Sequence, residues 1–329
     1  MKRIGNFING KEIEAISNDF LPVFDPSTGE QTSEVSLSNK DDFNKTIDNS
    51  KEALSSWLSF TPLKRSRIIS NYKNLIEKNI DELAALICKE HGKTFEDAKG
   101  SVTRGLEVVE FACGIPHLLK GEFSQNVGTN IDSWSIRQPL GICAGVTPFN
   151  FPLAIGMFWN AAPALVEGNT IVIKPSEDAP MSTQMAVKIY EEAGIPRGVI
   201  NLVHGEGDTG SLLCHADVDH ICFTGSAEVG QCIRRVAAES WHKTTSCEMG
   251  SKSACVIFDD ADIEKAVQST FWFKFYNAGQ CCNNINRFLV HKNVHDQFVD
   301  KFQRMMKQYL KLGDGMDKNT SIGPLINTQ

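Results

Sequence analysis

Two hydrophobic periodicities divide the chain. Between residues 39 and 113, apolar residues recur at close to helical spacing. Helical stretches begin at Asn39, at Pro62 and at Asp81, and Gly92 closes the third of them. The pattern predicts an N-terminal layer of helices.

From residue 140 onward, short β-rich runs alternate with helical patterns. The runs are GICAGVTP, NTIVIKPSE, VINLVHG, HICFTGS, TTSCEMG and ACVIFDD. Strand-then-helix alternation is typical of an α/β protein with a doubly wound parallel sheet. Because helices cover both faces of such a sheet, its strands are almost continuously apolar, as IVI, VINLV and ACVIF are.

Ligands of such sheets bind beyond the carboxyl ends of the strands. Five segments directly follow predicted strands and are therefore the first places to search for chemistry. They are TPFNFP, KPSE, HGEG, FTGS and CEMG. We interpret GEGDTG, at 205–210, as a turn, because its two acidic residues would repel phosphate.

Composition narrows the classes of partner. The formal charge of −7 carries no long basic block, which argues against nucleic acid and anionic membranes as partners. Prolines and asparagines interrupt the most apolar region, residues 140–167, and no apolar core of signal-peptide length follows the first basic residues. We therefore expect a cytoplasmic protein. Its ten scattered cysteines lack a CxxC pair, which favours reduced thiols over disulfides or a metal site.

Two strand ends have the residue types that a dinucleotide needs. Lys174 and Glu177 in KPSE can donate to and accept from ribose hydroxyls. In GSAEVG, residues 225–230, the glycines and the start of the next helix offer backbone N–H groups to a pyrophosphate. Taken singly, each segment is equally compatible with an ordinary turn.

Three further residues are candidates for catalysis. Asn150 lies between two prolines that restrict the backbone and would orient its amide toward an oxyanion. Glu248, in an otherwise apolar setting, would activate water if its pKa were raised. A thiol of the pair Cys281–Cys282 would act as a nucleophile. A turn asparagine, a surface glutamate and a pair of small core residues are the plain alternatives.

The order of these motifs is more specific than any one of them. TPFNFP, IVIKPSE, FTGSAEVG, CEMGSK and NAGQCC occur in the order and at the separations that are typical of the aldehyde dehydrogenase superfamily. The resemblance extends from FINGKEI near the start to SIGPLI near the end. It implies an NAD-dependent oxidoreductase that acts on an aldehyde.

The resemblance also implies roles for single residues. It makes Cys282 the nucleophile, Glu248 the general base and Asn150 a side-chain donor of the oxyanion hole. It assigns Lys174 and Glu177 to the adenosine ribose, and it places Gly225, Ser226 and Gly230 along the pyrophosphate. Because a carboxylate repels a 2′-phosphate, Glu177 favours NAD over NADP.

Within the superfamily, the N-terminal half is most similar to methylmalonate-semialdehyde dehydrogenases. The likeness lies in EHGKTFEDAKGSVTRGLEVVEFACG and SIRQPLGICAGVTPFNFP, and it makes Arg104 a substrate-binding residue. That subgroup has arginine where this chain has Cys281, and it typically lacks Glu248. Both differences favour hydrolysis over coenzyme A as the acyl acceptor and leave other semialdehydes or general aldehydes open as substrates.

The resemblance further predicts how the chain is organised. It implies that residues 1–120 and 140–250 form a Rossmann-like NAD-binding domain with the N-terminal helical layer. Residues 121–139 would be an oligomerisation strand segment, and 251–329 the start of an incomplete second α/β domain, the catalytic domain. A homodimer or homotetramer is expected of the full-length form. Because the superfamily continues beyond SIGPLI, we also expect a truncated product or a partial sequence, and for it a non-catalytic nucleotide-binding fragment is the competing hypothesis.

Overall fold

The computed structural model describes residues 2–328, and a seven-stranded sheet forms its centre. Five strands of this sheet are parallel, in the order β12-β11-β8-β9-β10, which is 5-4-1-2-3 in chain order. This is the order of a doubly wound sheet that reverses between β8 and β11. The strands are β8 (Ile142–Val146), β9 (Thr170–Lys174), β10 (Ile200–Leu202), β11 (His220–Gly225) and β12 (Thr244–Met249).

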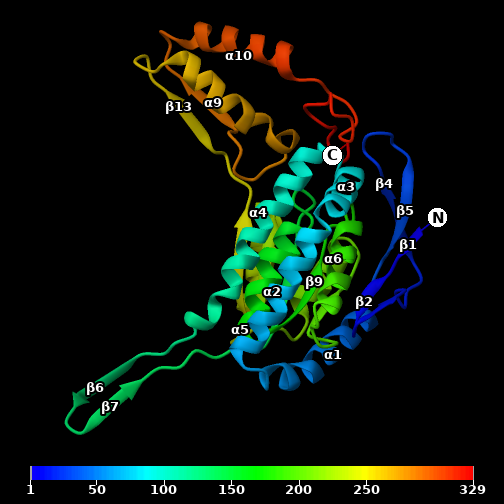
Figure 1. The fold of residues 1–329 in the computed structure, drawn as a ribbon, viewed down its shortest axis with the longest axis vertical. Helices are drawn as coiled ribbons and strands as arrows, with labels where there is room; N and C mark the ends of the chain where they lie inside the picture. The colour runs from blue at the N-terminus through cyan, green and yellow to red at the C-terminus, as the bar shows by residue number, and fades with distance from the viewer. Residues whose placement is uncertain (1, 329) are drawn as a thin grey trace.

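Helices cover both faces of the sheet, which confirms the predicted fold class (Figure 1). On one face, Ile171 and Ile173 join a core with α2, α4, α5 (Ala161–Glu167) and α6 (Met181–Glu192). On the other, Val172 packs in a core with α1, α7 (Gly207–His215) and α8 (Ala227–Ala238). Alternate side chains of the central strands therefore enter different cores.

The predicted N-terminal helical layer is present as four helices. They are α1 (Lys40–Leu58), α2 (Pro62–Lys78), α3 (Ile80–His91) and α4 (Phe95–Cys113). Asn39 forms a capping box with Asp42 at the start of α1, and Thr94 caps α4. Gly92 ends α3 with φ of 86°, a conformation that glycine adopts without a Cβ penalty. The helix boundaries thus follow the local signals of the sequence.

The first five strands of the chain lengthen the central sheet and form a second, smaller sheet. β2 (Asn6–Ile8) and β3 (Lys11–Ile13) continue the central sheet as antiparallel strands beyond β10. β1 (Lys2–Ile4), β5 (Gln31–Ser36) and β4 (Phe20–Phe24) form a separate three-stranded sheet. A π-helix, η2 (Ala154–Asn160), links β8 to α5.

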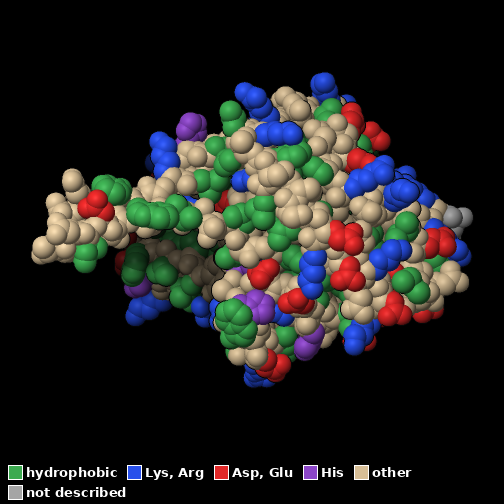
Figure 2. Space-filling model, turned by 90° about the horizontal axis from the view of Figure 1, so that it is seen from below, with side chains coloured by type: hydrophobic (Ala, Val, Ile, Leu, Met, Phe, Trp, Pro, Cys, Tyr) green, Lys and Arg blue, Asp and Glu red, His purple; other side chains and the backbone are tan. Residues whose placement is uncertain are grey.

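A hairpin leaves the body between α4 and β8 (Figure 1). It follows the short 3-10 helix η1 (Ile115–His117) and consists of β6 (Phe123–Gly128) and β7 (Ile131–Trp134). Figure 2 shows it as an arm with apolar side chains on its surface. Its residues Phe123 and Trp134 are 65% and 67% exposed. It lies within the segment predicted for oligomerisation.

The chain after β12 forms a separate small lobe, which corrects one expectation. ACVIFDD reads as a strand of the large sheet, but β13 (Ala254–Ile257) pairs only with β14 (Arg287–Val290) among the described strands. α9 (Ile263–Phe275), the 3-10 segment η3 (Tyr276–Gly279) and α10 (His295–Tyr309) complete the lobe, which has its own core. The apolar pattern of β13 reflects packing on α9 and α10 rather than burial between two helical layers.

The last described residues return from this lobe to the N-terminal helical layer (Figure 1). The Phe95 N–H donates to the Gly315 carbonyl oxygen at 2.9 Å. Gly323 lies so close to Gly92 that an added Cβ would fall 1.8 Å from the Gly92 oxygen. Among residues 2–328, no helix is both long enough and apolar enough to span a membrane.

Candidate active site

A cavity of about 540 Å³ opens where the strand order reverses, between the carboxyl ends of β8 and β11. Residues 146–149 after β8 and residues 223–226 at the end of β11 form two of its walls. One side of α7, from Gly207 to Cys214, and one side of α8, from Glu228 to Val236, form the others. The site is where a doubly wound sheet binds its ligand, and its volume is within the range of small-molecule sites.

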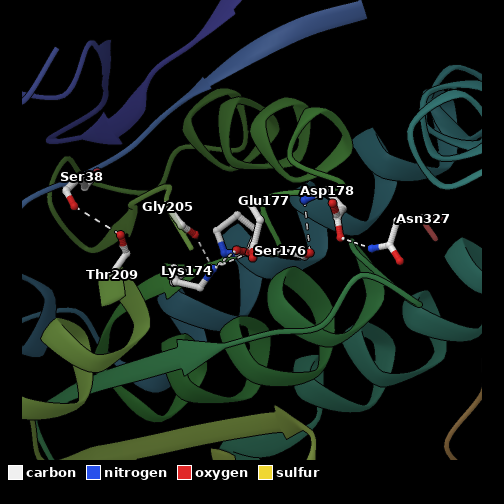
Figure 3. Close-up of polar contacts among 9 residues, drawn as sticks. Ser38, Lys174, Ser176, Glu177, Asp178, Gly205, Thr209 and Asn327 are labelled. Atoms are coloured by element: carbon white, nitrogen blue, oxygen red, sulfur yellow. Dashed lines mark hydrogen bonds and ion pairs between the residues drawn. The ribbon is translucent and has the colours of Figure 1, made fainter. Parts of the chain in front are cut away.

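Lys174 and Glu177 line this cavity together (Figure 3). The Lys174 ammonium donates to the carbonyl oxygens of Gly205 at 2.6 Å and Pro175 at 2.8 Å, and to Glu177 Oε2 at 3.1 Å. Burial lowers the pKa of Lys174, and the Glu177 carboxylate opposes this shift. Because all three ammonium protons have acceptors, a ribose hydroxyl would have to replace one of them, and the half-exposed Glu177 is the replaceable partner.

The end of β11 and the start of α8 form the part of the cavity where backbone N–H groups are available to an anion. Gly225 and Ser226 line it, and the Ser226 hydroxyl accepts from the Val229 N–H at 3.3 Å as the N-cap of α8. The first turn of α8 therefore presents its backbone dipole to the cavity, as a pyrophosphate site requires. Together, a hydroxyl-binding pair and a helix N-terminus fit a dinucleotide.

Gly230, predicted beside the pyrophosphate, is not among the residues that line the cavity. A Cβ on it would fall 2.5 Å from the Met249 sulfur and 3.3 Å from the Phe223 ring. This geometry explains the glycine by close packing of α8 on β11 and β12, and its proposed contact with a cofactor stays a prediction.

GEGDTG differs from the turn that its acidic residues suggest. Gly207 and Gly210 lie in the first turn of α7, and both line the cavity. Helix α7 begins here although no side chain caps its start, so the helical pattern of the residues that follow outweighs the two glycines. The sequence reasoning therefore missed one wall of the cavity.

Directly beyond the cavity wall, Asn150 contacts the segment that contains the two cysteines. Its side-chain amide donates to the Gln280 carbonyl oxygen at 3.0 Å. Its own backbone carbonyl accepts from the Asn277 amide at 3.2 Å and from the Lys93 ammonium at 2.7 Å. The structure thus places the predicted oxyanion donor against the predicted nucleophile segment, 130 residues away in sequence.

The two thiols differ in environment. Cys282 is exposed, and its carbonyl oxygen accepts from the Ser251 hydroxyl at 2.8 Å. Cys281 is half-buried, and its thiol donates to Asn283 Oδ1 at 2.8 Å. Burial raises the pKa of Cys281, while Lys93 acts in the opposite direction. The accessible thiol of the pair is therefore Cys282, as a nucleophile requires.

Glu248 and Arg104 both lie at the surface. Glu248 is an exposed residue of β12, the edge strand of the sheet, so the apolar setting expected around it is wrong for the described chain. The side chains of β12 alternate between the two faces of the sheet: Cys247 and Met249 pack on the core with α8, whereas Glu248 lies on the face that the described residues leave open. Arg104 projects from α4, pairs with Glu107 and exerts its charge on Tyr276, whose pKa burial raises to about 12. Arg104 therefore lies on the same side of the molecule as the nucleophile segment.

Three functional candidates had no signal in the sequence. Lys93, Asn277 and Gln280 meet Asn150 in one hydrogen-bonded cluster. Lysine is usually a surface residue, so nothing in EHGKTF distinguishes the fully buried Lys93. Only NAGQ, with an asparagine and a glycine that tolerate left-handed backbone, hints at a special turn.

Comparison with known proteins places these features in a family. The profile described as aldehyde dehydrogenase family matches residues 13–329. A malonate-semialdehyde dehydrogenase of Pseudomonas aeruginosa is 38% identical over 99% of this chain, which covers 65% of the relative. The chain therefore spans about two thirds of the length of the curated relatives that it matches.

Solved structures agree with the sequence comparison. The crystal structure of methylmalonate-semialdehyde dehydrogenase from Oceanimonas doudoroffii has a TM-score of 0.95 and 38% identity, and the match covers 99% of this chain and 66% of that one. An NAD+ complex of aldehyde dehydrogenase from Bacillus cereus has a TM-score of 0.94 and 32% identity, with 99% and 67% covered. The fold is therefore shared along nearly all of the chain.

Proposed function

Because the chain belongs to the aldehyde dehydrogenase family, we propose that it oxidises an aldehyde with NAD. The observation that carries the proposal is the segment after β8. Residues 146–149 line the nucleotide cavity, and the next residue, Asn150, contacts the segment of Cys282. One continuous piece of chain therefore connects a cofactor site to a candidate nucleophile.

The proposed chemistry assigns one task to each candidate residue. The Cys282 thiolate adds to the aldehyde carbon, and the oxyanion accepts hydrogen bonds from the Asn150 amide and the Cys282 backbone N–H. Bound NAD would supply the hydride acceptor. Water then opens the resulting thioester as Glu248 removes its proton, and a carboxylic acid is released.

We assign the nucleotide to the cavity described above. Lys174 and Glu177 would hold the adenosine ribose, and Gly225 and Ser226 the pyrophosphate, while Gly230 would support them through helix packing. Glu177 disfavours NADP, because its carboxylate would face a 2′-phosphate. The solved neighbours include both an NAD+ complex from Bacillus cereus and an NADP-dependent enzyme from E. coli, so Glu177 alone carries this preference.

The substrate that we propose is a small semialdehyde, such as malonate or methylmalonate semialdehyde. The names of the relatives from Pseudomonas aeruginosa and Oceanimonas doudoroffii support it. Arg104 would then bind the substrate carboxylate, which a guanidinium recognises through two parallel hydrogen bonds. Another semialdehyde or a general aldehyde is the alternative, since Cys281 replaces the arginine typical of that subgroup.

For product release we propose water, with coenzyme A as the alternative acceptor. Glu248 supports water, because it supplies a carboxylate on the strand that ends beside Gly250. Glu248→Gln should then slow steady-state turnover while single-turnover NADH formation persists. Turnover that requires coenzyme A, or that the substitution leaves unchanged, would overturn the hydrolytic step.

We also propose that the hairpin of β6 and β7 joins a second copy of the chain. It extends away from the body (Figure 1), and its exposed apolar side chains, including Phe123 and Trp134, have no cover within the described chain. A homodimer or homotetramer would cover them. The division into residues 1–120 with 140–250, 121–139 and 251–329 is part of the same proposal.

A non-catalytic nucleotide-binding role is the second candidate function. Two observations favour it: the cavity proposed for the nucleotide is enclosed by several elements, whereas the proposed catalytic residues Cys282 and Glu248 are exposed. The test is to titrate the purified chain with NAD and then to add malonate, methylmalonate and succinate semialdehydes. NADH formation supports the dehydrogenase, whereas NAD binding without NADH supports the second role, and no binding of NAD contradicts both.

A further inference from the structure

The backbone immediately before the cysteine pair follows a left-handed turn. Asn277, Ala278 and Gly279 have φ of 55°, 55° and 77°, and the Gln280 N–H closes the turn onto the Asn277 carbonyl oxygen at 3.0 Å. Glycine adopts this conformation freely and asparagine tolerates it, but alanine pays on the order of 1–2 kcal/mol. The turn therefore needs contacts from outside to persist.

The Asn277 side chain supplies the first of these contacts. It is fully buried, and its amide nitrogen donates to the Gln280 carbonyl oxygen at 3.0 Å and to the Asn150 carbonyl oxygen at 3.2 Å. Its backbone N–H donates to the Asp97 carboxylate at 3.3 Å. The hydrogen bonds of Asn277 thus close the turn and connect it to the segment after β8 and to the first turn of α4.

Lys93, in the loop before α4, acts on the turn through Asn150, which contacts both Asn277 and Gln280. Its side chain is fully buried, its ammonium donates to the Asn150 carbonyl oxygen at 2.7 Å, and the same ammonium lies 4.6 Å from the centre of the Phe151 ring. Burying an ammonium costs free energy unless partners compensate it. The partners here are the Asn150 carbonyl, the aromatic face and the nearby Asp97 carboxylate, which counters the fall in the Lys93 pKa to about 7.

We propose that Lys93 and Asn277 are positioning residues for the reaction at Cys282. Both donate to the Asn150 carbonyl oxygen, so they fix the backbone from which the Asn150 amide projects and the turn from which the cysteines follow. Neither residue touches the reacting atoms in this assignment. The inference rests on the proposed function for its chemical meaning, but the geometry that it claims is testable without turnover.

Hydrogen exchange of the 329-residue chain tests that geometry. Lys93→Met and Asn277→Gly should each accelerate exchange in residues 276–282 at least tenfold, while the helices α2 and α6 keep their rates. Asn277→Gly keeps a residue that adopts positive φ without strain. Faster hydrogen exchange in the turn would therefore result from loss of the Asn277 side-chain hydrogen bonds and not from backbone strain. Ala278→Gly, which removes strain but keeps both donors, should change the rate less than threefold.

Lys51→Met is the matched control, because Lys51 forms only an exposed ion pair with Asp217. It should leave residues 276–282 within twofold of the parent. If Lys93→Met accelerates exchange only around residues 88–98, or accelerates all helices equally, the positioning role is overturned.

Kinetics add a readout that a purely structural role would not produce. In preparations that form NADH, Lys93→Met should lower kcat at least tenfold while KM for the aldehyde and Kd for NAD stay within twofold. A parent chain without NADH formation contradicts the proposed function alone, and the exchange experiment then decides the positioning role.

Discussion

The nucleotide cavity and the nucleophile segment lie next to each other yet differ in how the chain encloses them. Lys174 is buried at the end of a central strand, with three acceptors for its ammonium. Cys282 and Glu248, in contrast, are exposed, one in a loop and the other on an edge strand. Two sequence motifs, IVIKPSE and FTGSAEVG, led to the cavity, and three, TPFNFP, CEMGSK and NAGQCC, led to the reactive residues.

This difference has a physical origin in the sheet. Parallel strands covered by helices on both faces bury their ends and fix the side chains that follow them. An edge strand and a loop depend on partners from elsewhere, which for the nucleophile segment are Asn150, Lys93 and Asp97. Binding and reaction should therefore respond separately to substitution.

The largest difference between an effect on NADH formation and an effect on NAD affinity is expected for substitution of the nucleophile, Cys282. Cys282→Ser replaces a thiol by a hydroxyl that is hardly ionised at neutral pH, so NADH formation should fall more than about a thousandfold. NAD affinity should stay within twofold, because Cys282 does not line the cavity. Cys281→Ser is the matched control, and a greater loss there than at Cys282 would reverse the assignment.

Substitution of Lys174 is expected to act on NAD affinity instead. Lys174→Met removes the buried ammonium, and we expect a Kd for NAD at least tenfold weaker by calorimetry. Lys188→Met, which removes only an exposed ion pair to Glu12, should leave the affinity unchanged. Normal affinity of a folded Lys174→Met chain would show that the nucleotide binds elsewhere.

One contribution to the pH dependence of stability should come from His204, on the side of the cavity. His204 is fully buried beside Lys174, and burial first, then the Lys174 charge, lowers its pKa to about 3. Below its ordinary pKa of about 6.5 the unfolded chain binds a proton that the folded chain excludes, so stability falls as pH drops from about 6.5 toward 3.

His204→Gln removes this proton uptake. The Tm of the variant should therefore decrease less between pH 7 and pH 5 than the Tm of the parent chain, in scans at constant ionic strength. Equal decreases in the two proteins would show that other groups control acid stability.

The smallest effects are expected in α4, which contacts the nucleophile segment through Asp97 and packs on η2. A Cβ on Gly105 would fall 2.1 Å from the Phe158 ring, so Gly105→Ala should destabilise the chain by about 1–3 kcal/mol. Exposed Gly100 has nothing within 4 Å, so Gly100→Ala should stabilise it by about 0.5–1 kcal/mol. Denaturant titrations measure both, and equal signs would show that packing on η2 is not as described.

Much of the fold was predictable because its signals are local. Gly92, Asn39 and Thr94 end or begin helices by their own backbone and side-chain preferences. The apolar runs of β8 to β11 predicted the sheet. The apolar run at β13 was wrongly assigned to the large sheet, because the sequence of an apolar strand does not distinguish burial in a large sheet from burial in a small lobe.

The sequence by itself determined the family, through the order of its motifs, and the strand ends where chemistry should be sought. It also identified Cys282, Asn150 and Lys174 as candidates. Only the tertiary structure brought Asn150 to Gln280, buried Lys93 beside them and left Glu248 exposed. Burial and contacts between distant segments depend on packing of the whole chain, and no local pattern encodes them.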